Sequence, residues 1–275
     1  MKKLIRSIVN LKPVKYVVGS RTFKKLIGPN LAFKLKKVAM NRVDELFVIT
    51  DYFQKNKIKG AMIDVGVHYG ESSIPFLEAG WKVYGFEPDI NNLAVIKKNI
   101  PANPNFKLFE FAVAEKPGEL NFYTSEESTG ISSLLNFHET HQVSQVVKVD
   151  TLNNVIETEK IEPISFVKID AEGFDLFVLQ GMDFHKYNTV QMIICEYEDG
   201  KTLKLGYTVK DMIEYLQQFG YKVLVCEWEP IVKYGVSHKF RSANVYPCET
   251  DPKAWGNLIA YRDPAFEKFA LKQLN

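Results

Sequence analysis

The stretch from Ala61 to Ser72 constrains the fold of this chain more than any other. An apolar run ends at Gly66, the chain turns, and Gly70 opens a segment with helical character. This order of strand, loop and helix is typical of the junction at which an open α/β sheet binds its ligand. Glycine lets such a loop pass close beneath a small molecule, because glycine has no Cβ. The alternative interpretation is a tight turn that only caps the helix.

An acidic residue ends the following apolar run. Glu87 comes directly after residues 82–86 and lies about 20 residues beyond the glycine loop, a spacing that suits a carboxylate holding ribose hydroxyls. The loop itself carries Val67, His68 and Tyr69, whereas a dinucleotide-binding loop needs a further glycine beneath the pyrophosphate. The sequence therefore favours a nucleoside ligand without phosphates, such as S-adenosylmethionine.

Apolar runs alternate with helical segments along the rest of the chain. Strands are predicted at residues 60–66, 82–87, 106–111, 119–123, 143–149, 164–170, 190–195, 221–228 and 257–261. Helices are predicted at residues 70–79, 89–99, 151–160, 174–180 and 211–219. Strands that alternate with helices of this length indicate a parallel, doubly wound sheet. The polar residues 125–133, which include Gly130, are predicted to form a loop over the ligand site.

Charge is distributed unevenly. Residues 1–43 hold twelve Lys and Arg residues and no acid, although the whole chain has a formal net charge of only +2. We predict a basic helical arm over residues 1–50 and a ligand-binding body over residues 51–275. A basic amphipathic arm binds an anionic membrane surface, or it packs on the body with its lysines in solvent. A targeting presequence is a third alternative, whereas nucleic acid is disfavoured because no aromatic stacking platform accompanies the charge.

The cysteines and the apolar runs bear on the compartment. Cys195, Cys226 and Cys248 are widely spaced and form no ligand pair, which indicates a reducing compartment. We find no signal peptide and no apolar run long enough to cross a bilayer. We therefore expect a cytoplasmic protein that is peripheral at the inner membrane face if the arm binds there.

The segment from Phe166 to Phe174 is the second informative motif. Lys168, Asp170 and Glu172 alternate with apolar residues, so in a strand their side chains would point to the same face. A lysine between two carboxylates can be a purely structural ion cluster, since buried charges need partners. The functional alternative places Asp170 at the carboxyl edge of its strand, beside Asp64 and facing the ligand crevice.

In these motifs the chain resembles the FkbM-type methyltransferases, a family of class I S-adenosylmethionine-dependent enzymes. The resemblance rests on Asp64–Ser72, Phe86–Pro88 and Lys168–Gly173, and it covers residues 58–200. It implies a seven-stranded, Rossmann-like sheet that is mostly parallel and has an antiparallel last strand. It also implies that the body transfers a methyl group to an oxygen, often a sugar or polyketide hydroxyl.

The resemblance also implies the roles of individual residues. Glu87 would bind the ribose hydroxyls, as its spacing already predicts, and Asp64 would lie near the methionine amine. Phe111 and Ala112 would lie near the adenine. The predicted cofactor-binding residues are Asp64, Gly66, His68, Gly70, Glu71, Ser72, Glu87, Pro88, Phe111, Ala112 and Asp170.

Methyl transfer requires an acceptor oxygen in line with the methyl carbon, and a base or a metal that weakens its O–H bond. The candidate bases are Asp170, His68, Glu172 and Glu196, and Asp170 leads by its position. Asp170 with Glu196 would suit Mg²⁺, which prefers oxygen ligands, although their spacing does not demand a metal.

These observations together predict an O-methyltransferase acting on a hydroxyl, that of a sugar in a glycan or glycolipid. Loops 125–145 and 229–256 would build the acceptor pocket. Three aromatic residues are candidates to stack on a sugar ring, with core packing as the alternative: Trp228, Tyr234 and Trp255. Two other functions remain as alternatives, a non-catalytic nucleoside-binding module tethered by the arm and a nicotinamide-dependent oxidoreductase.

Overall fold

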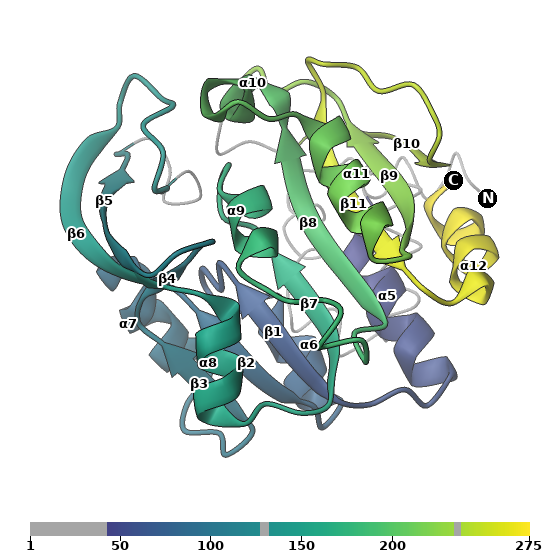
Figure 1. The fold of residues 1–275 in the computed structure, drawn as a ribbon, viewed down its shortest axis with the longest axis horizontal. Coiled ribbons are helices and arrows are strands. Elements are labelled where there is room, and N and C mark those ends of the chain that lie inside the picture. The colour runs from purple at the N-terminus through teal and green to yellow at the C-terminus, as the bar shows by residue number, and fades with distance from the viewer. Residues whose placement is uncertain (1–42, 127–131, 234–237) are drawn as a thin grey trace, which may run out of the picture.

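A mixed sheet runs through the centre of the computed structural model, which describes residues 43–126, 132–233 and 238–275 (Figure 1). Its strands are β1 (Ala61–Val65), β2 (Lys82–Phe86), β3 (Phe106–Phe109), β7 (Ile164–Ile169), β8 (Met192–Glu198), β9 (Lys222–Trp228), β10 (Phe240–Val245) and β11 (Trp255–Tyr261). In space they follow the order β10-β9-β11-β8-β7-β1-β2-β3. Strands β3, β2, β1, β7 and β8 pair in parallel, whereas β11 is antiparallel to both β8 and β9.

The prediction of a doubly wound, mostly parallel sheet with an antiparallel last strand is confirmed. Strand β11 is the last along the chain, and it inserts between β8 and β9. An eighth strand, β10, was not predicted; it pairs antiparallel with β9 and extends the edge of the sheet.

Helices cover both faces of this sheet. They are α5 (Glu45–Lys55), α6 (Ser73–Glu78), α7 (Ile90–Asn99), α8 (Leu152–Glu159), α9 (Asp175–Gln180), α10 (Asp199–Thr202), α11 (Val209–Gln218) and α12 (Pro264–Leu274), with a 3₁₀ turn η2 (Leu203–Leu205). Alternate residues of β1 show how the faces divide, because successive side chains of a strand point in opposite directions. Ile63 packs in the core formed with α8, α9 and α11, whereas Met62 packs in the core formed with α5, α6 and α12.

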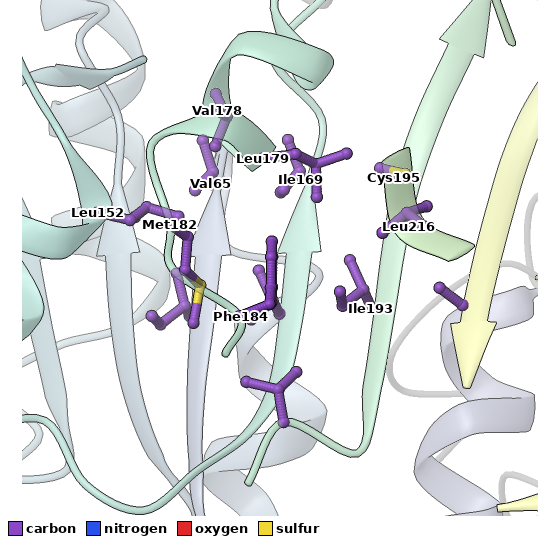
Figure 2. Close-up of a cluster of buried hydrophobic side chains, with 14 of the residues drawn as sticks. Val65, Leu152, Ile169, Val178, Leu179, Met182, Phe184, Ile193, Cys195 and Leu216 are labelled. Atoms are coloured by element: carbon purple, nitrogen blue, oxygen red, sulfur yellow. The ribbon is translucent and has the colours of Figure 1, made fainter. Parts of the chain in front are cut away.

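Figure 2 shows the first of these cores. Val65, Ile169 and Ile193 extend from neighbouring strands, and Leu179 of α9 and Leu216 of α11 cover them. Each of the five is at most 5 % exposed, and burying one such side chain contributes about 1.5–3 kcal/mol. The motifs Asp64–Ser72 and Lys168–Gly173 begin in the last two residues of β1 and β7.

Helix α5 shows how the basic arm joins the body. Asp44 caps the helix, because its carboxylate accepts the N–H of Phe47 at 2.9 Å. Ile49 is fully buried, and the predicted boundary between residues 50 and 51 falls inside this packed helix. Residues 1–42 of the arm lie outside the described residues. None of the helices in the described ranges is long and apolar enough to cross a bilayer.

A second, three-stranded sheet flanks the first at the left of Figure 1. Its strands are β4 (Ala112–Val113), β5 (Gly118–Thr124) and β6 (Gln142–Asp150), and β6 lies in the middle. The single strand predicted at residues 106–111 is therefore wrong at its end. Strand β3 stops at Phe109, and the chain then joins the second sheet because Ala112 pairs with Val149 of β6.

Candidate active site

The loop after β1 lies directly against the end of β7. Gly66 has a φ of +74°, and a Cβ at this position would lie 2.0 Å from the carbonyl oxygen of Asp170, so only glycine fits. The ammonium of Lys168 donates to the carbonyl oxygens of Val65 and Gly66 at 3.0 and 2.6 Å. These contacts join the glycine loop and the acidic motif of β7 into one unit.

Asp64 lies behind this unit. It is fully buried, and its Oδ2 accepts hydrogen bonds from the hydroxyls of Ser72 and Ser73 at 2.7 and 2.5 Å. Burial raises the pKa of Asp64, and the charge of Lys168 opposes the rise. The Lys168 ammonium is 3.5 Å from Asp64 Oδ1 and 3.4 Å from Asp170 Oδ2. Lys168 therefore connects the buried carboxylate with the one at the surface.

The predicted alternation of charges along a single strand is wrong beyond Ile169, where β7 ends. Glu172 has a φ of +50° and Gly173 a φ of +98°, so the chain turns out of the strand. Lys168 consequently lies between Asp64 and Asp170, and Glu172 has a different partner, Lys201.

Lys201 of α10 is surrounded by carboxylates. Its Nζ is 2.5 Å from Glu172 Oε2, 2.8 Å from Glu198 Oε2 and 3.4 Å from Glu196 Oε2. The strand predicted at residues 190–195 continues further, so Glu196 lies inside β8. Asp170, Glu172 and Glu196 each offer an oxygen, and these oxygens lie within 4.8 Å of one another. We call Asp170, Glu172, Glu196 and Glu198 the acidic cluster.

Burial shapes the protonation of the acidic cluster. It raises the pKa of Glu172 to about 7, and the charge of Lys201 opposes the rise. Burial also raises the pKa of Glu196 well above its usual range. Near neutral pH the cluster therefore carries less negative charge than four free carboxylates would.

A cleft opens at the carboxyl ends of β1, β2 and β7, with the second sheet as a further wall. Eight of the predicted site residues line it: Gly66, His68, Glu87, Pro88, Phe111, Ala112, Asp170 and Glu172. Five others do not: Asp64, Gly70, Glu71, Ser72 and Glu196. Asn92 and Phe122 also line the cleft and were not predicted, and Ser133 and Leu134 line it from the loop predicted to build the acceptor pocket. Ser133 belongs to the polar loop predicted over the site, and residues 127–131 of that loop lie outside the described residues.

Glu87 is held in place by two backbone groups. Its carboxylate accepts the N–H of His68 at 2.8 Å and that of Asp89 at 2.9 Å. The residue is only 4 % exposed, and burial raises its pKa to about 7 although both N–H groups oppose the rise. The carboxylate therefore links the glycine loop to the start of α7.

His68 has a backbone φ of +51°, and its ring stacks on Tyr69 with the centroids 3.8 Å apart. Burial lowers the pKa of His68, although the negative charge of Asp170 opposes the fall. At neutral pH the imidazole is therefore uncharged, and in this form it can accept a proton.

The chemistry of the cleft indicates which ligand it suits. Three of its lining residues are acids, Glu87, Asp170 and Glu172, and no Lys or Arg lines it among the described residues. A phosphate would lack a cationic partner here, whereas a positively charged sulfonium would be favoured. Phe111 and Ala112 provide an apolar wall for a flat base. The residues present thus fit a phosphate-free, cationic nucleoside.

A second cavity meets the cleft at Asp170, which lines both. Its other walls include Glu45 at the start of α5, Lys168 of β7 and Asn257 of β11. Glu45 Oε1 accepts hydrogen bonds from the indole of Trp228 at 2.8 Å and from the amide of Asn257 at 3.3 Å. Asp170 is therefore accessible from two directions.

The aromatic residues proposed for sugar stacking lie elsewhere. Trp228 is 6 % exposed, and Trp255 stacks on it with a centroid distance of 5.6 Å. Neither lines the cleft, so core packing accounts for both. Tyr234 lies outside the described residues.

The fold and the cleft define a Rossmann-like α/β protein with a nucleoside site. Residues 64–223, more than half of the chain, match the model of the methyltransferase FkbM domain. The chain therefore belongs to the FkbM methyltransferase family, and it is an S-adenosylmethionine-dependent methyltransferase. No curated protein sequence matches the chain.

Three solved structures show distant likenesses to the chain. The chain is similar to WbdD at 13 % identity and a TM-score of 0.43, over 82 % of this chain and 42 % of that chain. It is similar to the magnesium protoporphyrin IX methyltransferase ChlM of Synechocystis PCC 6803, solved with bound SAM, at 11 % identity and a TM-score of 0.38, over 95 % and 97 %. It is similar to an rRNA methylase of Streptococcus thermophilus at 10 % identity and a TM-score of 0.40, over 79 % and 96 %. Likenesses at this level leave the acceptor open.

Proposed function

We propose that this methyltransferase acts on a hydroxyl oxygen, and that the hydroxyl belongs to a sugar in a glycan or glycolipid. The observation that supports this most strongly is the position of Asp170, which lines the cleft and also belongs to the acidic cluster. A neutral hydroxyl is a poor nucleophile, so a base must take its proton during transfer. Asp170 is the base in this proposal.

The residues of the cleft divide between the parts of the cofactor. Glu87 holds the ribose hydroxyls, Phe111 and Ala112 hold the adenine, and Gly66 borders the sugar. When bound, S-adenosylmethionine supplies an electrophilic methyl group on a sulfonium. Asp64 does not line the cleft, so we assign it a role through Lys168, which it holds beneath Asp170.

The acidic cluster favours a polyhydroxylated acceptor. The neighbouring hydroxyls of a sugar lie on one face, and each can donate to an ionised carboxylate or accept from a protonated carboxyl group. Asp170, Glu172 and Glu196 bring their oxygens within 4.8 Å of one another, which suits two adjacent hydroxyls. An aromatic acceptor with one hydroxyl would contact only one of these three carboxyl groups.

The test has two stages. The purified chain should bind S-adenosylhomocysteine in a calorimetric titration, and it should then release this product when mixed with a suitable acceptor from a panel. The panel should contain free sugars, glycolipids, small phenols and RNA. Absence of binding would refute the proposed cofactor site. Release with RNA or phenols alone would refute the sugar as the acceptor. Binding without release from any acceptor would favour a non-catalytic module.

We further propose that the basic segment of residues 1–42 binds an anionic membrane surface. The described chain starts at Val43, which is buried, and Asp44 and Glu45 line the second cavity. The first described residues thus line a cavity that Asp170 also lines. A membrane-bound arm would bring a glycolipid acceptor close to the site.

A variant lacking residues 1–42 should bind vesicles of anionic phospholipid at least about tenfold more weakly, because each Lys or Arg near such a surface contributes about 1 kcal/mol. Co-sedimentation measures this, and vesicles of neutral phospholipid are the control. The deletion stops before Val43 because that side chain is buried in the core. Equal sedimentation of both proteins would refute membrane binding by the arm, provided that both still bind S-adenosylhomocysteine equally.

A further inference from the structure

Lys201 has more carboxyl partners than a buried ammonium needs. It is 3 % exposed, and three carboxylates lie within ion-pair distance: Glu172, Glu196 and Glu198. Burying an ammonium is costly unless it is paired, but a single well-placed carboxylate provides the pairing. The excess indicates that the ammonium serves the carboxylates, because carboxylates at these distances repel one another unless a cation lies among them.

In many proteins a converging set of carboxylates holds a divalent ion. Here the oxygens of Asp170, Glu172 and Glu196 are close enough together to bind one. However, Lys201 Nζ already lies 2.5 Å from Glu172 Oε2 and 3.4 Å from Glu196 Oε2. A divalent ion bound to these two oxygens would be pressed against the ammonium, and two like charges in such contact repel strongly.

The position of Lys201 is enforced by its surroundings. The ring of Phe137 lies 5.0 Å from the ammonium, a distance that favours a cation. The stem of the side chain passes Gly173, where a Cβ would lie 3.5 Å from Lys201 Cβ. Gly173 is itself fixed, because its carbonyl oxygen accepts the hydroxyl proton of Tyr207 at 2.7 Å. Three separate segments therefore hold this ammonium at one point.

We propose that Lys201 is a positioning residue that takes the place of a metal ion at the acceptor side of the site. Its ammonium gathers Glu172, Glu196 and Glu198 into one surface beside Asp170, and methyl transfer therefore needs no added divalent ion. The acceptor side is part of the proposed function, on which this role in catalysis rests. The role of Lys201 as the cation of the acidic cluster can be measured separately.

The test compares Mn²⁺ binding, followed by electron paramagnetic resonance, in the full chain and its variants. Lys201→Ala should bind Mn²⁺ about tenfold or more tightly than the wild-type chain, because it leaves the carboxylates without their cation. Lys201→Arg keeps the charge and should bind as weakly as the wild type. Lys204→Ala is the matched control, because it removes the same charge from an exposed neighbour in η2. Turnover of Lys201→Ala should fall, and Mn²⁺ should restore part of it.

Two results would overturn the proposal. One is tight Mn²⁺ binding by the wild-type chain, and the other is Lys201→Ala binding no more Mn²⁺ than Lys204→Ala. If Lys201→Ala unfolds when purified, refolding with Mn²⁺ but not without it would support the proposal, and failure with both would count against it. Titration of the wild type with S-adenosylhomocysteine tests the cofactor site alone, so a failure of the proposed function would be recognised separately.

Discussion

Replacing Asp170 by asparagine should lower the rate of methyl transfer by about 10²- to 10⁴-fold, the range that a general base contributes. Asparagine keeps the shape of the side chain but cannot take a proton from the acceptor hydroxyl. The carboxylate lines both the cleft and the second cavity. The affinity for S-adenosylhomocysteine should change only a few-fold, because Glu87 and the apolar wall remain.

The measurement is the turnover number with the acceptor found in the panel, together with calorimetry of the product. Asp183→Asn is a matched control, because Asp183 is exposed and its carboxylate caps a turn by accepting the N–H groups of His185 and Lys186. Unchanged turnover in Asp170→Asn would remove Asp170 as the base. The next candidate would then be His68, whose neutral ring also lines the cleft, and His68→Gln should be the variant that loses activity.

The parts of the site that could be predicted depend on local sequence. The glycine loop, Glu87 and Asp170 each follow an apolar run, and apolar runs of this length form strands whose ends lie at one edge of a parallel sheet. Gly66 and Glu87 come directly after β1 and β2, which are consecutive along the chain and pair in parallel. Local pattern therefore identified three residues that line the cleft.

The acceptor side could not be predicted in this way. Lys201 lies about 30 residues from Glu172 in the chain, and only the packing of α10 against the end of β8 brings them together. The turn at Glu172 is also hidden, because a non-glycine residue with positive φ leaves no clear signal in sequence. The burial of Asp64 likewise depends on hydroxyls from the start of α6.

Helix α12 was not predicted, although its signals were present in the sequence. Asp263 caps it, Pro264 occupies its first turn, and Phe266, Ala270 and Leu274 recur at helical spacing and are buried. Such a cap followed by proline and an apolar stripe predicts a helix. Strand β10 had no comparable signal. It is an edge strand, and its pairing with β9 defines it.

The second large effect concerns Glu87, whose replacement by glutamine should weaken S-adenosylhomocysteine binding by about 10- to 100-fold. Hydrogen bonds to a charged group contribute about 1.5–3 kcal/mol, and the ribose hydroxyls would lose a charged acceptor. The amide would also turn a donor toward the N–H of His68 or Asp89, which now donate to the carboxylate. Thermal unfolding should therefore be measured beside calorimetry, so that a loosened loop can be distinguished from a lost contact.

The pH dependence of the same binding follows from the pKa of Glu87, which burial raises to about 7. The ribose hydroxyls donate to the ionised carboxylate, so below that pH the free protein must release a proton when the ligand binds. Affinity should then fall by up to about tenfold for each pH unit below 7, and it should be constant above about pH 8. Calorimetry in buffers of different ionisation enthalpy counts the released proton directly.

Glu172 also lines the cleft, and burial raises its pKa to about 7 as well, so it is the natural control. If Glu87 binds the ribose, Glu87→Gln should bind weakly at every pH and release no proton, whereas Glu172→Gln should keep the slope of the wild type. If the pH dependence of the affinity survives in Glu87→Gln but disappears in Glu172→Gln, the released proton comes from the acidic cluster. In that case the ribose would have to be held by another group of the cleft, because a titrating carboxylate that contacts its hydroxyls must appear in the binding isotherm.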